Sequence, residues 1–351
     1  ETVFEGDVGA ARVTSKSSRP EEDGKHHKEA LQQCLMSYSN HSSPLSFILT
    51  GIPGLEDAQF WIAFPFCTMY FMAVLGNITV LLAIWMDPSL HLPMFYFLSM
   101  LAAIDLVLIT STMPKLLSIF WFHSHEIDFE GCVAQMFFIH SFSIAESGVL
   151  LTMAFDRYLA ICKPLHYSAI LTGPTTAKLG LAAVGRGTAI IIPLSSMVAS
   201  LSYCGSHVID HSYCEHMSMV KLACGDTRPN CIYGITVATI VVGSDSILIA
   251  VSYRLILREV LGLSSREARL KSFCTCGSHI AVILLFYIPG LFSFYTDRWG
   301  QSIPAHLRIL VADLYLLVPP MLNPLIYGMR TKQIRELVLS LLRQKGIPSR
   351  S

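Results

Sequence analysis

Residues 58–86 read AQFWIAFPFCTMYFMAVLGNITVLLAIWM and contain no Asp, Glu, Lys or Arg. A helix crosses the hydrocarbon core of a bilayer with about 20 apolar residues, so this stretch is long enough. Barrel strands would instead alternate apolar and polar residues over about 10 positions. Six further stretches carry at most one charged residue each: 88–114, 131–155, 179–209, 229–253, 272–296 and 309–329. The pattern predicts an all-α membrane protein, a bundle of seven transmembrane helices.

The composition agrees with this prediction. The chain has 351 residues, of which 52% are hydrophobic and only 14% are charged. A soluble domain carries about 25% charged residues, so a water-soluble globule is excluded. The 25 basic and 25 acidic residues balance, whereas a nucleic-acid partner would call for a basic excess. We therefore expect a membrane lipid environment and no nucleic-acid partner.

The chain divides into three regions by composition. Residues 1–45 are polar and rich in charge, which predicts a disordered tail, and residues 46–330 form the membrane domain. In residues 331–351, Ile334 and Leu337 begin a series of apolar residues interleaved with charges. This pattern suits a short amphipathic helix on the membrane surface, with a solvated tail as the alternative.

Basic residues predict the orientation of the bundle. Lys and Arg concentrate in one set of connections, which includes Arg157, Lys163, Arg254, Arg258 and Lys271. Because cytoplasmic loops carry the excess of Lys and Arg, this set is expected to be cytoplasmic. The N-terminus is then extracellular, and we expect a multi-pass protein of the plasma membrane.

Several motifs occur in order along the seven spans. MAFDRYLAIC (153–162) closes the third span, KSFCTCGSH (271–279) opens the sixth, and PMLNPLIY (320–327) closes the seventh. Together they resemble the olfactory receptors among the rhodopsin-like G-protein-coupled receptors. FYIP (286–289) and DRWG (297–300) resemble the class I, or fish-like, branch. The resemblance covers about residues 45–345. It implies an odorant receptor, not an enzyme, that activates a stimulatory, olfactory-type G protein and raises cyclic AMP.

An acid and a base lie side by side at the inner end of the third span, at Asp156 and Arg157. Such an ion pair can hold a helix in one state and release the arginine in another. The resemblance implies that Arg157 is released to contact the G protein, and the alternative is a simple interfacial anchor. It also assigns activation-linked positions to Tyr158, Tyr253, Tyr287, Asn323 and Tyr327.

Polar side chains also occur inside the predicted spans, where they are costly and default to functional hypotheses. Asn77, Asp105, Glu146 and Asn323 each lie near the middle of a span. The resemblance favours a sodium ion between Asp105 and Glu146, and the alternative is a water-filled hydrogen-bond network. Asp245 and Asp313 have no obvious partner by position. No other cofactor is expected.

Four cysteines lie on the predicted outer side: Cys132, Cys204, Cys214 and Cys224. Because that side is oxidising, they are expected to form two disulfides. Spacing alone allows three connectivities. The resemblance selects Cys132–Cys214 and Cys204–Cys224, with Cys231 as a competitor for the second bridge.

Two shorter motifs lie in the same outer regions. His211, Glu215 and His216 surround Cys214 and could form a metal site, unless a disulfide removes the thiolate. Asn40 begins an Asn-His-Ser sequon, which predicts glycosylation of the tail.

Two polar residues are candidates for ligand binding. His140 lies eight residues beyond Cys132 on the third span, a depth of about 12 Å. Arg298 lies at the outer end of the sixth span, and a guanidinium binds a carboxylate through two parallel hydrogen bonds. Class I receptors that resemble this chain recognise short carboxylic acids with arginine and histidine at these positions. Residues expected to hold the alkyl chain are Ile191, Leu194, Ala238 and Phe294.

Two kinds of alternative remain: ordinary structural roles for these residues, and a different function for the protein. Arg298 could be an ordinary loop charge, and His140 a hydrogen-bonded core histidine. A secondary transporter of small organic acids would also contain acids within its spans. Transporters commonly show paired repeats, and no repeat is visible in this sequence.

Overall fold

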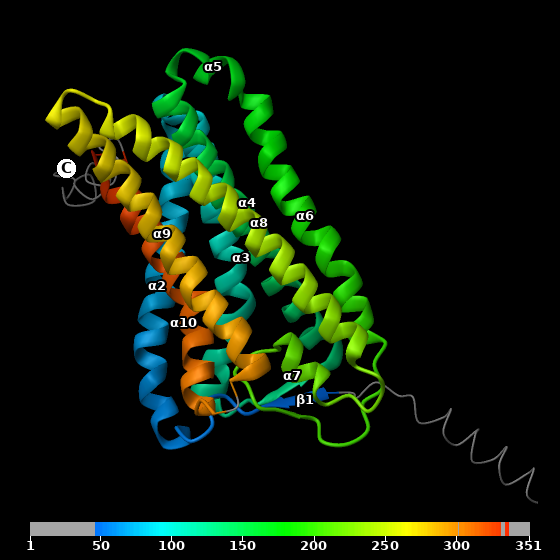
Figure 1. Cartoon of the computed structure of the whole chain (residues 1–351). Helices are drawn as coiled ribbons and strands as arrows, with labels where there is room; N and C mark the ends of the chain where they lie inside the picture. Colours follow the sequence, from blue (N-terminus) through cyan, green and yellow to red (C-terminus); the bar gives the residue numbers. More distant parts are fainter. Residues whose placement is uncertain (1–45, 301, 331–333, 337–351) are drawn as a thin grey trace, which may run out of the picture. The chain divides into compact units, whose positions relative to one another are not determined.

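The computed structural model describes residues 46–300, 302–330 and 334–336. Within these residues, seven helices are long and apolar enough to cross a membrane, which confirms the predicted bundle (Figure 1). They are α2 (Glu56–Met86), α3 (Pro93–Phe122), α4 (Phe129–Cys162), α6 (Gly173–Ala199), α8 (Arg228–Leu261), α9 (Arg266–Trp299) and α10 (Ala305–Arg330). The connections contain η1 (Pro88–Leu90), η2 (Pro164–His166), α5 (Tyr167–Ile170) and α7 (His216–Val220).

Two of the predicted regions lie mainly outside the described residues. The tail at residues 1–45, with the sequon at Asn40, is outside them. Of the amphipathic helix predicted in residues 331–351, only residues 334–336 are described, and they are helical.

A small sheet adds to the all-helical prediction. Its strands are β1 (Ser46–Leu49), β2 (Glu126–Asp128) and β3 (Val208–Ile209), in the order β2-β1-β3. The first pair is antiparallel and the second is parallel. Phe47 of β1 is fully buried and packs edge-on against Tyr203. We call the end of the bundle that carries this sheet and α7 the sheet end (Figure 1).

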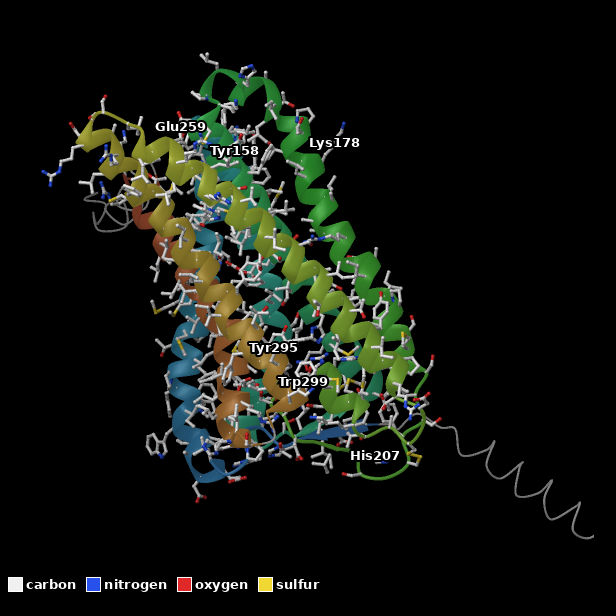
Figure 2. All side chains as sticks on the ribbon, viewed as in Figure 1. Tyr158, Lys178, His207, Glu259, Tyr295 and Trp299 are labelled. Atoms are coloured by element: carbon white, nitrogen blue, oxygen red, sulfur yellow. A yellow bond between two sulfur atoms is a disulfide. The ribbon has the colours of Figure 1, made fainter. Side chains whose placement is uncertain are left out.

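The opposite end of the bundle carries α5 and the connection between α8 and α9 (Figure 1). Tyr158 and Glu259 lie at this end in Figure 2, whereas His207 and Trp299 lie at the sheet end. Because Arg157 lies next to Tyr158 near the end of α4, we call this the Arg157 end.

Helix α4 contacts α3, α6 and α8 and so lies at the centre of the bundle. Its close approach to α6 depends on Gly187, where an added Cβ would lie 2.2 Å from the carbonyl oxygen of Ser141. Large apolar side chains on the outside, such as Trp61 at 70% and Trp85 at 77% exposed, present the surface that lipid would cover.

Candidate functional site: a cavity at the sheet end

A cavity of about 400 Å³ lies among α4, α6, α8, α9 and α10 and is covered by residues just before and within α7. All six residues predicted for ligand binding line it: His140, Ile191, Leu194, Ala238, Phe294 and Arg298. They come from four different helices, and the structure brings them to one space.

Arg298 is folded back along α9 toward the cavity. Its guanidinium lies 3.7 Å from the centre of the Phe294 ring, and Nη1 donates a hydrogen bond of 3.2 Å to the Phe294 carbonyl. Its Nε is buried without a hydrogen-bond partner. The guanidinium therefore keeps hydrogen-bonding capacity within the protein.

Gly234 on α8 makes room for Arg298 and for His216. A Cβ added at Gly234 would lie 3.1 Å from Nη2 of Arg298 and 3.1 Å from Cε1 of His216. Such contacts are tighter than ordinary van der Waals packing, so a side chain here would displace one of the two groups.

Two imidazoles border the same cavity. Nε2 of His140 and Nε2 of His216 are both buried without a hydrogen-bond partner. Burial lowers the pKa of His216 to about 3, and the charge of Arg298 acts in the same direction. The His216 ring is therefore neutral near pH 7.

An acid lies beside Arg298 as well. Glu215 caps α7 by accepting a 2.8 Å hydrogen bond from the Ser218 backbone N–H. Burial and the charge of Asp297 raise the pKa of Glu215, Arg298 opposes the shift, and the resulting pKa is about 7. The Glu215 carboxyl therefore changes its charge near neutral pH, next to the guanidinium.

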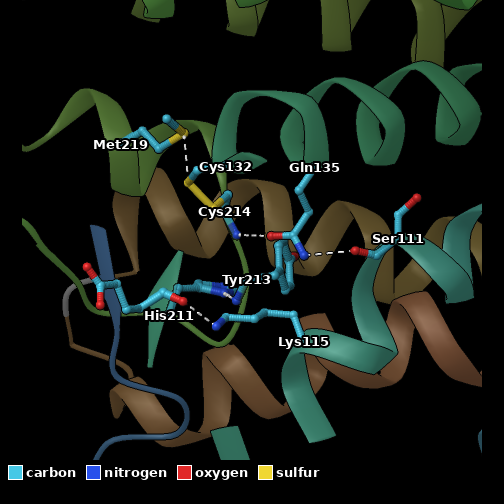
Figure 3. The surroundings of a disulfide bond; sticks show 9 residues. Ser111, Lys115, Cys132, Gln135, His211, Tyr213, Cys214 and Met219 are labelled. Carbon is cyan, nitrogen blue, oxygen red and sulfur yellow. Dashed lines mark hydrogen bonds between the residues drawn. A yellow bond between two sulfur atoms is a disulfide. The ribbon is translucent and has the colours of Figure 1, made fainter. Parts of the chain in front are cut away.

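The segment that covers the cavity is fixed by a disulfide and a side-chain bridge (Figure 3). Cys214 is bonded to Cys132, and its backbone N–H donates to Oε1 of Gln135 at 2.9 Å. Gln135 in turn donates to the Ser111 carbonyl on α3 at 2.8 Å.

A second disulfide joins Cys204 to Cys224. Both pairings are those that the resemblance implies, and the competitor Cys231 carries a free thiol.

Asp245 and Asp313 both have partners that the sequence did not reveal. Arg186 donates to both oxygens of Asp245, at 2.8 and 2.7 Å, and Ser147 donates to Asp245 at 2.6 Å. Asp313 accepts from Ser212 at 2.5 Å, which ties the covering segment to α10. The sequence left the partners of these two acids open, because the partners come from other helices and a loop.

The proposed outer metal site is not formed. Cys214 is in a disulfide, and among the described residues no three His, Cys, Asp or Glu side chains gather for a metal ion.

Asp105 and Glu146, the acids predicted near the middle of the membrane, differ in their hydrogen bonds. Asn323 donates to the two oxygens of Asp105 at 3.3 and 3.0 Å. Oε1 of Glu146 and Oδ1 of Asn323 are buried without partners. Asn77 donates instead to the carbonyls of Ala73 and Pro320.

Comparison with known proteins identifies the family. Residues 66–345 match the family model described as "Olfactory receptor". The chain belongs to this family. Olfactory receptor 52K2 of Homo sapiens is 54% identical over 314 residues, 89% of this chain and 100% of the relative. Olfactory receptor 52R1 of Homo sapiens is 55% identical over 305 residues, 87% of this chain and 97% of the relative. Olfactory receptor 51E1 of Homo sapiens is 50% identical over 302 residues, 86% of this chain and 95% of the relative.

Membership settles several expectations. This olfactory receptor is an odorant-sensing G-protein-coupled receptor and a multi-pass membrane protein, not an enzyme. Relatives numbered 51 and 52 are consistent with the class I branch. The transporter interpretation is not favoured.

At the Arg157 end, the receptor forms the ion pair expected from its sequence. Asp156 and Arg157 pair at 2.5 Å, and Tyr167 donates to the other oxygen of Asp156 at 2.7 Å. Arg157 also contacts the Met94 sulfur at 2.6 Å.

A second cavity of about 170 Å³ borders Arg157 and includes Tyr327, whose hydroxyl is buried without a partner. Tyr253 forms a hydrogen bond with His279, which lines this cavity. Tyr158 is half-buried nearby and stacks on Phe155.

Several cavity residues of the receptor were not predicted for ligand binding. Glu215 and His216 were considered only for metal binding, and Gly234, Asp297 and Tyr315 were not singled out. The position of Glu215 and His216 directly after Cys214 was the available signal. A disulfide to the sheet end of α4 must hold the following residues over the space between the helices.

Proposed function

We propose that this olfactory receptor detects carboxylic acids at the sheet-end cavity and signals through a stimulatory, olfactory-type G protein to raise cyclic AMP. One observation carries the ligand class. The Arg298 guanidinium borders a mainly apolar cavity, and its Nε is buried without a partner.

The chemistry of a carboxylate matches this environment. Arginine binds carboxylates through paired, charge-assisted hydrogen bonds, and their strength increases where water is excluded. The neutral His216 ring can donate one further hydrogen bond to an anion. Ile191, Leu194 and Phe294 offer apolar contact to an alkyl chain.

The proposed orientation rests on charge. Arg254, Arg258 and Lys271 lie in or beside the connection between α8 and α9 at the Arg157 end. Since basic residues mark the cytoplasmic side, we place the Arg157 end in the cytoplasm and the sheet end outside. The cavity beside Arg157 would then face the G protein.

We also propose that Asp105 and Glu146 hold a sodium ion. The unpartnered oxygens of Glu146 and Asn323 fit a hard cation, which prefers oxygen ligands. When bound, the ion would neutralise charge in the bundle core. The family resemblance implies that such an ion stabilises the inactive state, so replacing external sodium by choline should lower the EC50 for an acid. An unchanged EC50 would argue against the ion.

Truncation of Arg298 tests the ligand class. In cells that express Arg298→Ala, the EC50 for octanoic acid in a cyclic AMP assay should rise about 10- to 100-fold, because charged hydrogen bonds are lost. Arg298→Lys keeps the charge but not the paired geometry, and should give an intermediate EC50.

The matched control is Arg228→Ala, which removes an exposed arginine at the start of α8. It should leave the EC50 unchanged, with surface expression measured for every variant. If Arg298→Ala matched Arg228→Ala, Arg298 would not be part of the ligand site.

A further inference from the structure

The cavity that contains Arg298 also has a polar surface at its inner end. Ser143 and Ser147 of α4, Ser246 of α8, Tyr287 of α9 and Tyr315 of α10 line the same space. Each carries a hydroxyl group, and we call this set the hydroxyl floor. An alkyl chain alone would offer these hydroxyl groups no hydrogen-bond partner.

The donor and the acceptor of each hydrogen bond between Tyr287, Ser147 and Asp245 can be assigned. Arg186 donates to both oxygens of Asp245, so both oxygens serve as acceptors. Ser147 therefore donates its proton to Asp245, at 2.6 Å. The 2.7 Å bond between Ser147 and Tyr287 then requires Tyr287 to be its donor.

This direction determines what the floor can offer a ligand. Once Tyr287 has donated its single proton to Ser147, its oxygen retains only the capacity to accept. Tyr287 lines the cavity and is 8% exposed. A ligand that reaches it must supply the proton, as a hydroxyl or an N–H does.

The spacing of the two polar ends sets the length of the ligand. Phe294, under the Arg298 guanidinium, lies seven residues from Tyr287 on α9, which is about 10 Å along the helix. An extended chain advances about 3.6 Å for every three bonds. About eight bonds therefore separate a group at Arg298 from a group at the floor.

We propose that the preferred ligand class is a carboxylic acid of medium length with a hydrogen-bond donor at its far end, such as an ω-hydroxy acid. This proposal rests on the proposed function, because Arg298 holds the carboxylate. The Tyr287 oxygen accepts from the distal donor, while the apolar walls contact the chain between them.

Matched ligands test the proposal on the unmodified receptor. ω-Hydroxyoctanoic acid and nonanoic acid differ by a hydroxyl in place of a methyl, and ω-methoxyoctanoic acid and decanoic acid differ by an ether oxygen in place of a methylene. The hydroxy acid should have an EC50 about fivefold to tenfold below that of nonanoic acid, since a satisfied buried hydrogen bond is gained. The methoxy acid, which has no donor, should be weaker than decanoic acid because its oxygen is buried unpaired.

The outcomes separate the two proposals. If all four acids are inactive, the carboxylic-acid function fails. If the plain acids activate and the hydroxy acid is equal to or weaker than nonanoic acid, the floor subsite alone is overturned. The EC50 of the methoxy acid could lie below that of decanoic acid by the same factor that separates the hydroxy acid from nonanoic acid. In that case the inferred direction of the hydrogen bonds is wrong.

The variant Tyr287→Phe tests whether the Tyr287 oxygen is the acceptor for the distal donor of the ligand. The ratio of the EC50 of nonanoic acid to the EC50 of the hydroxy acid should fall to about one, whereas Arg298→Ala should weaken both acids together. Because Tyr287 also contacts the Ser147–Asp245 network, displacement of a labelled acid should be measured beside cyclic AMP. A preserved preference for the hydroxy acid in Tyr287→Phe would contradict the assignment.

Discussion

At the sheet end, the segment over the cavity is held by covalent bonds and strand pairing: Cys132–Cys214, Cys204–Cys224 and the three-strand sheet. At the Arg157 end, Arg157 is held by a single ion pair and a contact with the Met94 sulfur. The described cysteines there include Cys162 and Cys276, which are free thiols.

This difference matches two different tasks. Recognition of a small ligand needs donors and acceptors held in fixed positions, which disulfides and strand pairing provide. A switch needs contacts that break at low cost, so that a modest binding energy shifts the population of states. The cavity around Arg298 suits the first task, and the contacts of Arg157 suit the second.

Of three further tests of this comparison, the largest effect is expected at the ion pair. Asp156→Asn removes the negative charge next to Arg157 while keeping the acceptor for Tyr167. Basal cyclic AMP should rise about tenfold, because loss of about 1.4 kcal/mol shifts a two-state equilibrium by that factor. Tyr167→Phe, which keeps the charge, should raise it less. Unchanged basal signalling in Asp156→Asn would show that this pair is only an anchor.

A smaller effect is expected from Gly234→Ala at the sheet end. The new Cβ would press on both Arg298 and His216, so the EC50 for octanoic acid should rise about fivefold through displacement of the guanidinium. Gly185→Ala on α6 is the matched control, because its Cβ would meet no atom within 4 Å and Gly185 is not among the residues that line the cavity. Equal EC50 changes in the two variants would mean that the position of Arg298 does not depend on Gly234.

The smallest effect is expected from external pH. The pKa of Glu215 lies at about 7, so this acid is charged above that pH and neutral below it. A neutral Glu215 no longer competes with a ligand carboxylate for Arg298. The EC50 should therefore fall about threefold between about pH 8 and about pH 6, where the ligand remains ionised.

Glu215→Gln should abolish this pH dependence and retain the low EC50. His211 and His216 cannot supply it, because burial lowers the pKa of each to about 3. If Glu215→Gln keeps the pH dependence, another group is responsible.

The sequence predicted the bundle well because charge depletion over more than 20 residues is a strong signal. It also placed Arg298 and His140 in one cavity, because the family resemblance assigns both to ligand binding and spacing along a helix gives the depth of His140. The sheet could not be predicted. Its strands have two to four residues and come from segments as far apart as Ser46 and Ile209.

The pairing of Arg186 with Asp245 escaped prediction for another reason. Both residues were visible as lone charges in apolar spans. The rotation of α6 and α8 about their own axes decides whether the two side chains meet, and neither span shows that rotation in its sequence. The roles of Glu215 and Asp313 depended in the same way on the path of the loop before α7.

The central claim is that Arg298 binds the ligand carboxylate, and direct binding tests it without the G protein. Purified receptor should bind radiolabelled octanoate, with the Kd raised about 10- to 100-fold in Arg298→Ala and unchanged in Arg228→Ala. Equal Kd values for the unmodified receptor and Arg298→Ala would contradict the account.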